Sequence, residues 1–131
     1  MIRTLRNVVS GLLLSVIALL VGCQRGPTLV PVQGKVVYQG RPLSAGSIYF
    51  QPDSAGGDAP QMASSLLQED GSFTLRTYPH GNGAMVGSYR VTVSLGFGAT
   101  PQLAKYTRVK DTPLKIDIPP EGRTDLVLTL E

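Results

Sequence analysis

Residues 89–95 read Tyr-Arg-Val-Thr-Val-Ser-Leu, and this stretch decides the fold class. Its apolar members alternate with polar ones: they are Tyr89, Val91, Val93 and Leu95. Successive side chains of a β-strand point to opposite faces, so the pattern predicts a strand with one buried and one exposed face. The C-terminal residues Leu126, Leu128 and Leu130 repeat the same alternation and predict a second such strand.

Five further segments have the composition of short strands. They are residues 30–38, 47–51, 62–67, 72–77 and 115–118. The chain holds 15 Gly and 10 Pro, and no stretch repeats apolar residues at helical spacing over a helix's usual length. Seven short antiparallel strands, each with one apolar face, must bury those faces against one another, which favours an all-β sandwich of two sheets. The expected core is Val32, Val36, Ile48, Phe50, Phe73, Leu75, Tyr89, Val91, Val93, Ile116, Leu126 and Leu128.

Turn-forming residues separate these strands. Gln39-Gly40-Arg41-Pro42 and Glu69-Asp70-Gly71 both predict hairpin connections, because their residues tolerate positive φ or preset a turn. Gly34 stands inside the first strand. A glycine there packs no side chain, so we expect a β-bulge or a close backbone approach.

The N-terminus has the organisation of an export signal. Arg3 and Arg6 precede an apolar run over residues 8–21, which is shorter than the ~20 residues that a membrane-spanning helix needs. The run ends in small residues, without a cluster of stop-transfer charges. Residues 1–22 are therefore predicted to be a cleaved signal peptide.

Leu20-Val21-Gly22-Cys23 resembles the lipobox of bacterial lipoproteins, which implies cleavage between Gly22 and Cys23 and a lipid on the Cys23 sulfur. Cys23 is the single cysteine, so no intramolecular disulfide can form. The alternative is an ordinary cleavage site with a chance cysteine beside it. Several acyl chains on one residue would suffice for stable anchoring, so we expect the mature protein to sit on a membrane without spanning it.

Removal of the signal leaves 109 of the 131 residues, which is the size of one domain. Residues 23–29 are expected to form a lipidated tether and residues 30–131 the β-domain. The formal charge of +3 includes Arg3 and Arg6, so the mature chain carries only +1, without charged blocks. Nucleic-acid binding is therefore not expected. Gln24, in place of an aspartate after the lipidated cysteine, favours the outer membrane, facing the periplasm or the cell exterior.

The strand and turn residues together resemble the carboxypeptidase regulatory-like, or transthyretin-like, domain, especially in small planctomycete lipoproteins. The matching pieces are Val32-x-Gly34, Gly40-x-Pro42-Leu43, Gly46-x-Ile48-x-Phe50-x-Pro52, Asp70-Gly71-x-Phe73-x-Leu75 and Gly87-x-Tyr89-x-Val91-x-Val93, followed by Lys105-Tyr106, residues 114–118 and residues 125–130. The resemblance covers nearly all of the mature chain. It implies a seven-stranded Greek-key sandwich, used across the family as a stabilising or interaction module, and it implies no catalytic site.

The sequence offers little to an enzyme. His80 is the only histidine and lies among turn formers, so neither a hydrolytic triad nor a histidine-based metal site is expected. The C-terminus also lacks the Tyr-Arg-Gly-Ser signature of hydroxyisourate hydrolase, the enzyme of the transthyretin-like fold. Asp53, Asp58, Glu69 and Asp70 match no calcium-loop spacing. We therefore expect no catalysis and no cofactor.

Residues 96–113 form an unusually long connection for a compact sandwich, and long loops are often functional. They contain a candidate interaction site with three cations and one aromatic: Lys105, Tyr106, Arg108 and Lys110. The alternative is that Tyr106 packs into the core while the cations remain solvated. The sequence thus predicts a non-catalytic, lipid-anchored envelope module that contacts an envelope protein or glycan. The rival prediction is a small-ligand, glycan or calcium-binding lipoprotein.

Overall fold

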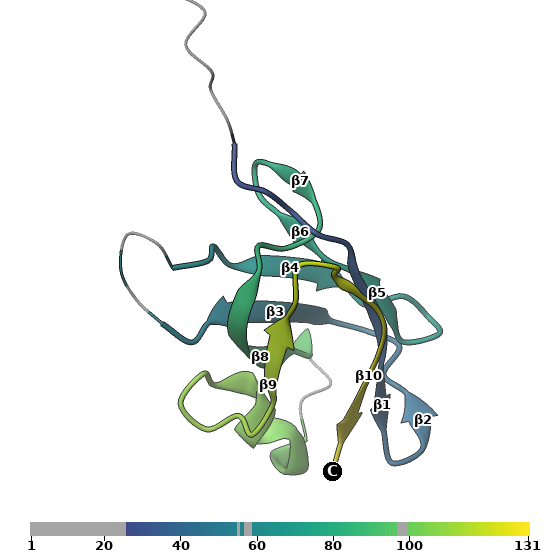
Figure 1. Cartoon of the computed structure of the whole chain (residues 1–131). Coiled ribbons are helices and arrows are strands. Elements are labelled where there is room, and N and C mark those ends of the chain that lie inside the picture. Colours follow the sequence, from purple (N-terminus) through teal and green to yellow (C-terminus); the bar gives the residue numbers. More distant parts are fainter. Residues whose placement is uncertain (1–25, 55, 57–58, 97–99) are drawn as a thin grey trace, which may run out of the picture.

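The computed structural model describes residues 26–54, 56, 59–96 and 100–131, and these form two packed β-sheets (Figure 1). The first sheet has the order β10-β1-β2, with β5 also paired to β1; its strands are β10 (Arg123–Leu130), β1 (Val32–Tyr38), β2 (Arg41–Pro42) and β5 (Ser72–Thr74). The second sheet has the order β7-β6-β4-β3-β8-β9; its strands are β7 (Gly81–Asn82), β6 (Arg76–Thr77), β4 (Ala63–Leu66), β3 (Ser47–Pro52), β8 (Gly87–Ser94) and β9 (Lys115–Ile118). A 3₁₀-helix, η2 (Pro101–Thr107), follows β8. The predicted all-β sandwich architecture is confirmed.

The core lies between the sheets and is centred on Phe50. Its ring centroid is 6.1 Å from that of Phe73 and 5.9 Å from that of Tyr89. Every residue of the predicted core is buried except Ile116, which packs against the core from the edge strand β9 and stays partly exposed. The structure adds eight buried hydrophobic residues: Val30, Ala63, Leu67, Ala84, Leu103, Tyr106, Ile118 and Leu130.

The first and last strands pair in parallel, so the prediction of uniformly antiparallel strands is wrong. The register of β1 and β10 sets Gly34 opposite Leu126 and Val36 opposite Leu128. Alternation fixes which side chains are buried, but it carries no information on strand direction. The direction follows from the chain path: after β9 the chain leaves the second sheet and runs along β1 from its N-terminal end.

The predicted strand over residues 72–77 is divided between the sheets at Leu75. Its first half, β5, pairs with β1, and its second half, β6, pairs with β4. The Asp70-Gly71 turn therefore does not close a simple hairpin: it joins β4 to a strand that pairs first with the other sheet. At the crossing, the Ser65 hydroxyl oxygen accepts a hydrogen bond from the Thr74 N–H at 3.3 Å.

The other turn and the internal glycine behave as the sequence predicts. Gln39 and Gly40 both have positive φ, and β1 and β2 pair across them as a hairpin. The β1–β10 register shifts between Val32 and Gly34, which is a bulge. A Cβ on Gly34 would lie 2.5 Å from the Leu126 carbonyl oxygen, so the close approach of β10 requires glycine.

Candidate functional site

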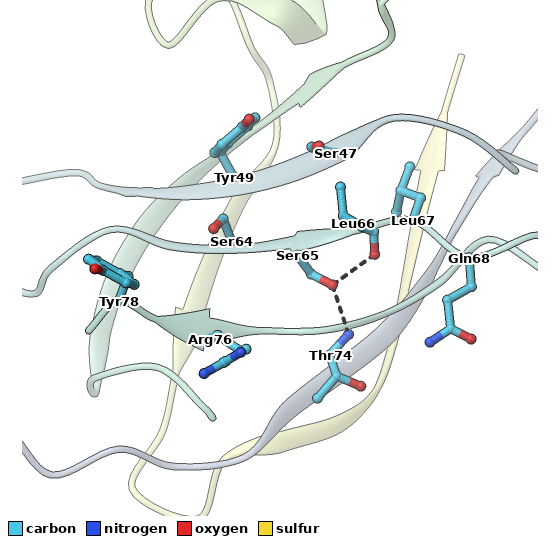
Figure 2. Close-up of a pocket in the computed structure, with 10 residues that line it drawn as sticks. All are labelled: Ser47, Tyr49, Ser64, Ser65, Leu66, Leu67, Gln68, Thr74, Arg76 and Tyr78. Atoms are coloured by element: carbon cyan, nitrogen blue, oxygen red, sulfur yellow. Dashed lines mark hydrogen bonds between the residues drawn. The ribbon is translucent and has the colours of Figure 1, made fainter. Parts of the chain in front are cut away.

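An open groove of ≈ 780 Å³ lies on the outer face of the second sheet (Figure 2). Its walls come from β3, β4 and the segment around β6. The lining residues are Ser47, Tyr49, Ser64, Ser65, Leu66, Leu67, Gln68, Thr74, Arg76 and Tyr78.

Strand alternation places these side chains on the outer face. On β3, Tyr49 lies between the buried residues Ile48 and Phe50. On the segment around β6, Thr74, Arg76 and Tyr78 are exposed and alternate with buried residues. Figure 2 shows the side chains of these three exposed residues along the groove. The same pattern that fills the core therefore builds the groove on its reverse side.

Strand pairing sets the groove residues side by side. Tyr49 is opposite Ser64 in the β3–β4 register, and Ser64 is opposite Arg76 in the β4–β6 register. The divergence of β4 from β5 opens the groove further along, where the Ser65 hydroxyl donates to the Leu66 carbonyl oxygen at 2.8 Å (Figure 2).

The groove lining combines tyrosine rings, hydroxyl groups, the side chains of Leu66 and Leu67, and one cation. Tyr78 is 89% exposed, whereas Tyr49 is half-buried in the wall. Arg76 is the single charged side chain of the lining. The ion pairs among the described residues join Asp53 to Arg90 and Lys115, and Arg108 to Asp111, so Arg76 takes part in none of them. The groove therefore presents an uncompensated positive charge beside hydrogen-bonding groups.

Sequence reasoning did not single out this groove. Its residues occupy the outward-facing positions of three strands. A prediction that uses only the apolar positions of the alternation does not select them. The signal was present in Tyr49, an aromatic residue at an outward position, and in Arg76 and Tyr78, which are two residues apart and so share a face.

The predicted interaction segment folds differently from a plain loop. Residues 101–107 form η2, whose inner face consists of the buried residues Leu103 and Tyr106. These are three residues apart, which matches the three-residue turn of a 3₁₀-helix and was the available sequence signal. Tyr106 is only 2% exposed, and its hydroxyl oxygen accepts a hydrogen bond from the Glu131 N–H at 2.9 Å. The expectation that Tyr106 packs into the core is confirmed, so its ring offers no recognition surface.

The three cations of this segment remain exposed. The Lys105 ammonium lies 5.0 Å from the centroid of the Tyr106 ring, which is cation–π distance. Arg108 is 3.7 Å from a carboxylate oxygen of Asp111 in an exposed ion pair, and Lys110 is exposed. The structure thus keeps the cations exposed on one surface segment, with Lys105 over the ring of the buried Tyr106. Gly22 and Cys23, the predicted cleavage and lipidation residues, lie outside the described residues.

Two of the four acidic residues considered for calcium, Asp53 and Asp70, hold structural contacts, and Asp58 lies outside the described residues. Asp53 accepts a 2.7 Å hydrogen bond from Arg90 Nε, which, with the nearby Lys115 ammonium, lowers the pKa of its carboxyl group. Hydrogen bonds from the Ser72 side chain and backbone lower the pKa of Asp70. Within the described residues, no three His, Cys, Asp or Glu side chains gather closely enough to hold a metal ion.

Tyr89 is the one strongly perturbed phenol. Burial raises its pKa to about 12, and its hydroxyl group donates to the Met85 carbonyl oxygen at 2.7 Å. The Tyr89 ring also packs against Phe50, so the side chain serves the core and stays neutral at physiological pH.

Among residues 26–131, apart from the few that the structure leaves undescribed, no helix has the length and apolar character needed to cross a membrane. The chain matches no family model, no curated protein and no solved structure.

Proposed function

We propose that this chain is a non-catalytic lipoprotein of the bacterial cell envelope whose β-sandwich acts as an interaction or structural module. In this proposal residues 1–22 are removed, Cys23 carries the lipid, and the domain lies on the membrane surface. The outer membrane is favoured by Gln24, with the domain facing the periplasm or the cell exterior. The resemblance to carboxypeptidase regulatory-like domains supports the Greek-key order and the non-catalytic role.

The position of Cys23 carries the proposal. It is the only cysteine of the chain, it follows an apolar run that ends in small residues, and it precedes Val30 by seven residues. Val30 is buried and exchanges two 2.9 Å backbone hydrogen bonds with Ala84, so the folded domain begins directly after the expected tether. A lipid at Cys23 would hold a compact domain against the membrane through a very short linker.

Two surfaces support an interaction role: the groove on the second sheet and the exposed cations of residues 105–110. In contrast, the polar groups inside the fold are occupied structurally. The buried hydroxyl groups of Thr77 and Thr112 donate to the carbonyl oxygens of Gly83 and Val91, at 2.9 and 2.6 Å. Among the described residues, no buried side-chain nitrogen or oxygen lacks a hydrogen-bond partner.

Mass spectrometry of the mature N-terminus tests the anchor. We expect a lipid-modified Cys23 as the first residue, and we expect the Cys23→Ala form to leave the membrane fraction. The matched control is Gln24→Ala, which should be processed and lipidated normally. An unmodified Cys23, or a Cys23→Ala form that still sediments with membranes, would contradict the anchor.

The cation cluster is tested with Lys105→Ala, Arg108→Ala and Lys110→Ala. Because these side chains are exposed, each substitution should change the free energy of unfolding by less than about 0.5 kcal/mol. If the cluster binds an envelope component, the variants should recover less of it from detergent-solubilised envelope, and wild-type recovery should fall as salt rises. Unchanged recovery in all three variants would exclude the cluster as the interaction site.

A further inference from the structure

We propose that the groove formed by β3, β4 and the segment around β6 binds an acidic oligosaccharide, that is, a chain of pyranose rings bearing carboxylate groups. This inference rests on the proposed function in one respect, because it names the class of partner that the envelope module would contact. The groove itself does not depend on lipidation.

Side chains, not backbone groups, must supply the contacts to a ligand in this groove. Tyr49, Ser64 and Arg76 lie on the outer face of continuous strand pairing, so the backbone donors and acceptors beneath them serve the sheet. An extended peptide that binds by adding a strand needs a free sheet edge. The groove floor offers a face instead, which favours a ligand recognised through its own hydroxyl groups and ring faces.

Two tyrosines suit the apolar faces of sugar rings. Tyr78 is 89% exposed and Tyr49 is half-buried, so both present part of a phenol ring toward the groove (Figure 2). They are separated by two strand spacings and two residues along the chain, which places their Cα atoms roughly 12 Å apart. This separation leaves room for more than one pyranose ring along the groove, which favours an oligosaccharide.

Polar groups along the groove match the hydroxyl groups of a sugar. Ser47, Ser64 and Thr74 contribute hydroxyl groups to the lining, and Gln68 adds an amide at the far end. The Ser65 hydroxyl is already engaged with Leu66 and Thr74. Serine and threonine hydroxyls both donate and accept, as sugar hydroxyls do, so donor and acceptor roles can be exchanged along the ligand.

Charge selects an acidic sugar over a neutral one. Arg76 is exposed, lies two residues from Tyr78 and across β4 from Tyr49, and takes part in no ion pair with a described residue. Among the described residues, no carboxylate belongs to the groove lining. A guanidinium group can bind a carboxylate through two parallel hydrogen bonds, so a uronic-acid ring beside Arg76 would gain a contact that a neutral ring lacks.

The test titrates the full chain with trigalacturonic acid at low ionic strength and follows the ligand by NMR. Its matched ligands are the methyl ester of the same trisaccharide, which has the same rings without charge, and triglutamate, which has the charges without rings. We expect trigalacturonic acid to bind most tightly. Equal or tighter binding of triglutamate would show that the groove takes acidic peptides and would overturn the saccharide proposal.

Three variants locate the binding. Arg76→Gln should lower the affinity for trigalacturonic acid about fivefold and leave the affinity for the methyl ester unchanged. Tyr78→Ala should lower the affinity for both trisaccharides about threefold or more. Tyr78→Phe should retain the wild-type affinity for both, because the ring face remains. Arg41→Gln removes an exposed arginine of the first sheet and should change nothing. Binding that is absent, or equal in all variants, would overturn the proposal.

The same titration on the Cys23→Ala form separates this inference from the anchor. Wild-type affinity in that form, together with a failed lipidation test, would refute the anchor and retain the groove. A lipidated protein that binds no saccharide would refute the groove alone.

Discussion

Tyr106 is fixed both by its ring and by its hydroxyl group. The ring is buried under η2, and the hydroxyl oxygen accepts the Glu131 N–H, which ties the helix to the end of β10. A residue that the sequence marked as a possible contact for a partner therefore closes the end of the sandwich. The neighbouring Lys105 covers the ring without burying its own charge.

Tyr106→Ala should lower the free energy of unfolding by about 3 to 5 kcal/mol, because it leaves a cavity in place of a buried aromatic ring. Tyr106→Phe keeps the ring and removes one hydrogen-bond acceptor, so its cost should be about 1 kcal/mol. Urea denaturation midpoints measure both. Gln102→Ala, on an exposed position of η2, is the control and should be near neutral. A Tyr106→Ala variant as stable as this control would show that the ring does not support the core.

Gly34 shows what can and cannot be predicted from a single residue of a strand. A glycine within a strand predicts a bulge or a close approach, and the structure contains both. The sequence could not say which strand approaches, because the partner, β10, lies some ninety residues further along the chain and pairs in parallel. The glycine predicts that another part of the chain comes close to this position, whereas the path of the whole chain determines which strand that is.

At the scale of elements, alternation predicts burial well and connectivity poorly. It identified the strands that carry the core, because period-two patterns state directly which faces are apolar. It missed the division of residues 72–77 at Leu75, since a strand that crosses between sheets keeps the same alternation throughout. It missed the groove for a related reason: outward residues from β3, β4 and β6 become neighbours only once the strand order is known.

An ion-pair network adds side-chain links between strands that are already paired in the second sheet. Asp53, just after β3, accepts a hydrogen bond from Arg90 on β8 and lies 3.8 Å from the Lys115 ammonium on β9. Arg90 also donates to the Val109 carbonyl oxygen at 3.3 Å. The network therefore fastens the 96–113 connection and the edge strand β9 to the centre of the second sheet.

This network predicts an acid-dependent loss of stability. The pKa of Asp53 is lowered in the folded state, mainly by the hydrogen bond from Arg90. The stabilisation is then fully present above the unfolded-state pKa of about 4 and disappears as the pH falls through the lower folded-state value. We expect Asp53→Asn to melt below the wild type at pH 7, and the two melting temperatures to approach each other as the pH falls from about 4 through the lower folded-state pKa of Asp53.

Thermal melts of both proteins across this pH range measure the effect, with Asp125→Asn as the control. Asp125 is exposed and belongs to no ion pair of the described residues, so its variant should follow the wild type at every pH. A constant difference between wild type and Asp53→Asn at all pH values would show that the carboxylate's charge is not the stabilising feature.

At the scale of the whole molecule, the place where the chain joins the fold decides which end would face a membrane. The described chain begins at Gly26 beside the β6–β7 turn, where a Cβ on Gly26 would lie 3.8 Å from His80 Nδ1. In Figure 1 the C-terminus lies at the opposite end, as do β9 and the ends of β1 and β10. The run of β1 alone, from Val32 to Tyr38, separates the two ends by roughly 20 Å.

A lipid on Cys23 would hold the β7 end close to the bilayer, because the three residues from Cys23 to Gly26 span at most about 11 Å. We expect a dye on Asn82→Cys, in β7, to be quenched more strongly by headgroup-bound quenchers than a dye on Thr129→Cys, near the end of β10. Both positions are exposed, and an acylated Cys23 cannot react with the dye. In the Cys23→Ala background the two dyes should be quenched equally and weakly.

Equal quenching in the lipidated protein would show that the domain is not oriented by its tether. Stronger quenching at Thr129 would place the C-terminal end, with the cations of residues 105–110, against the membrane and turn that cluster into a lipid contact.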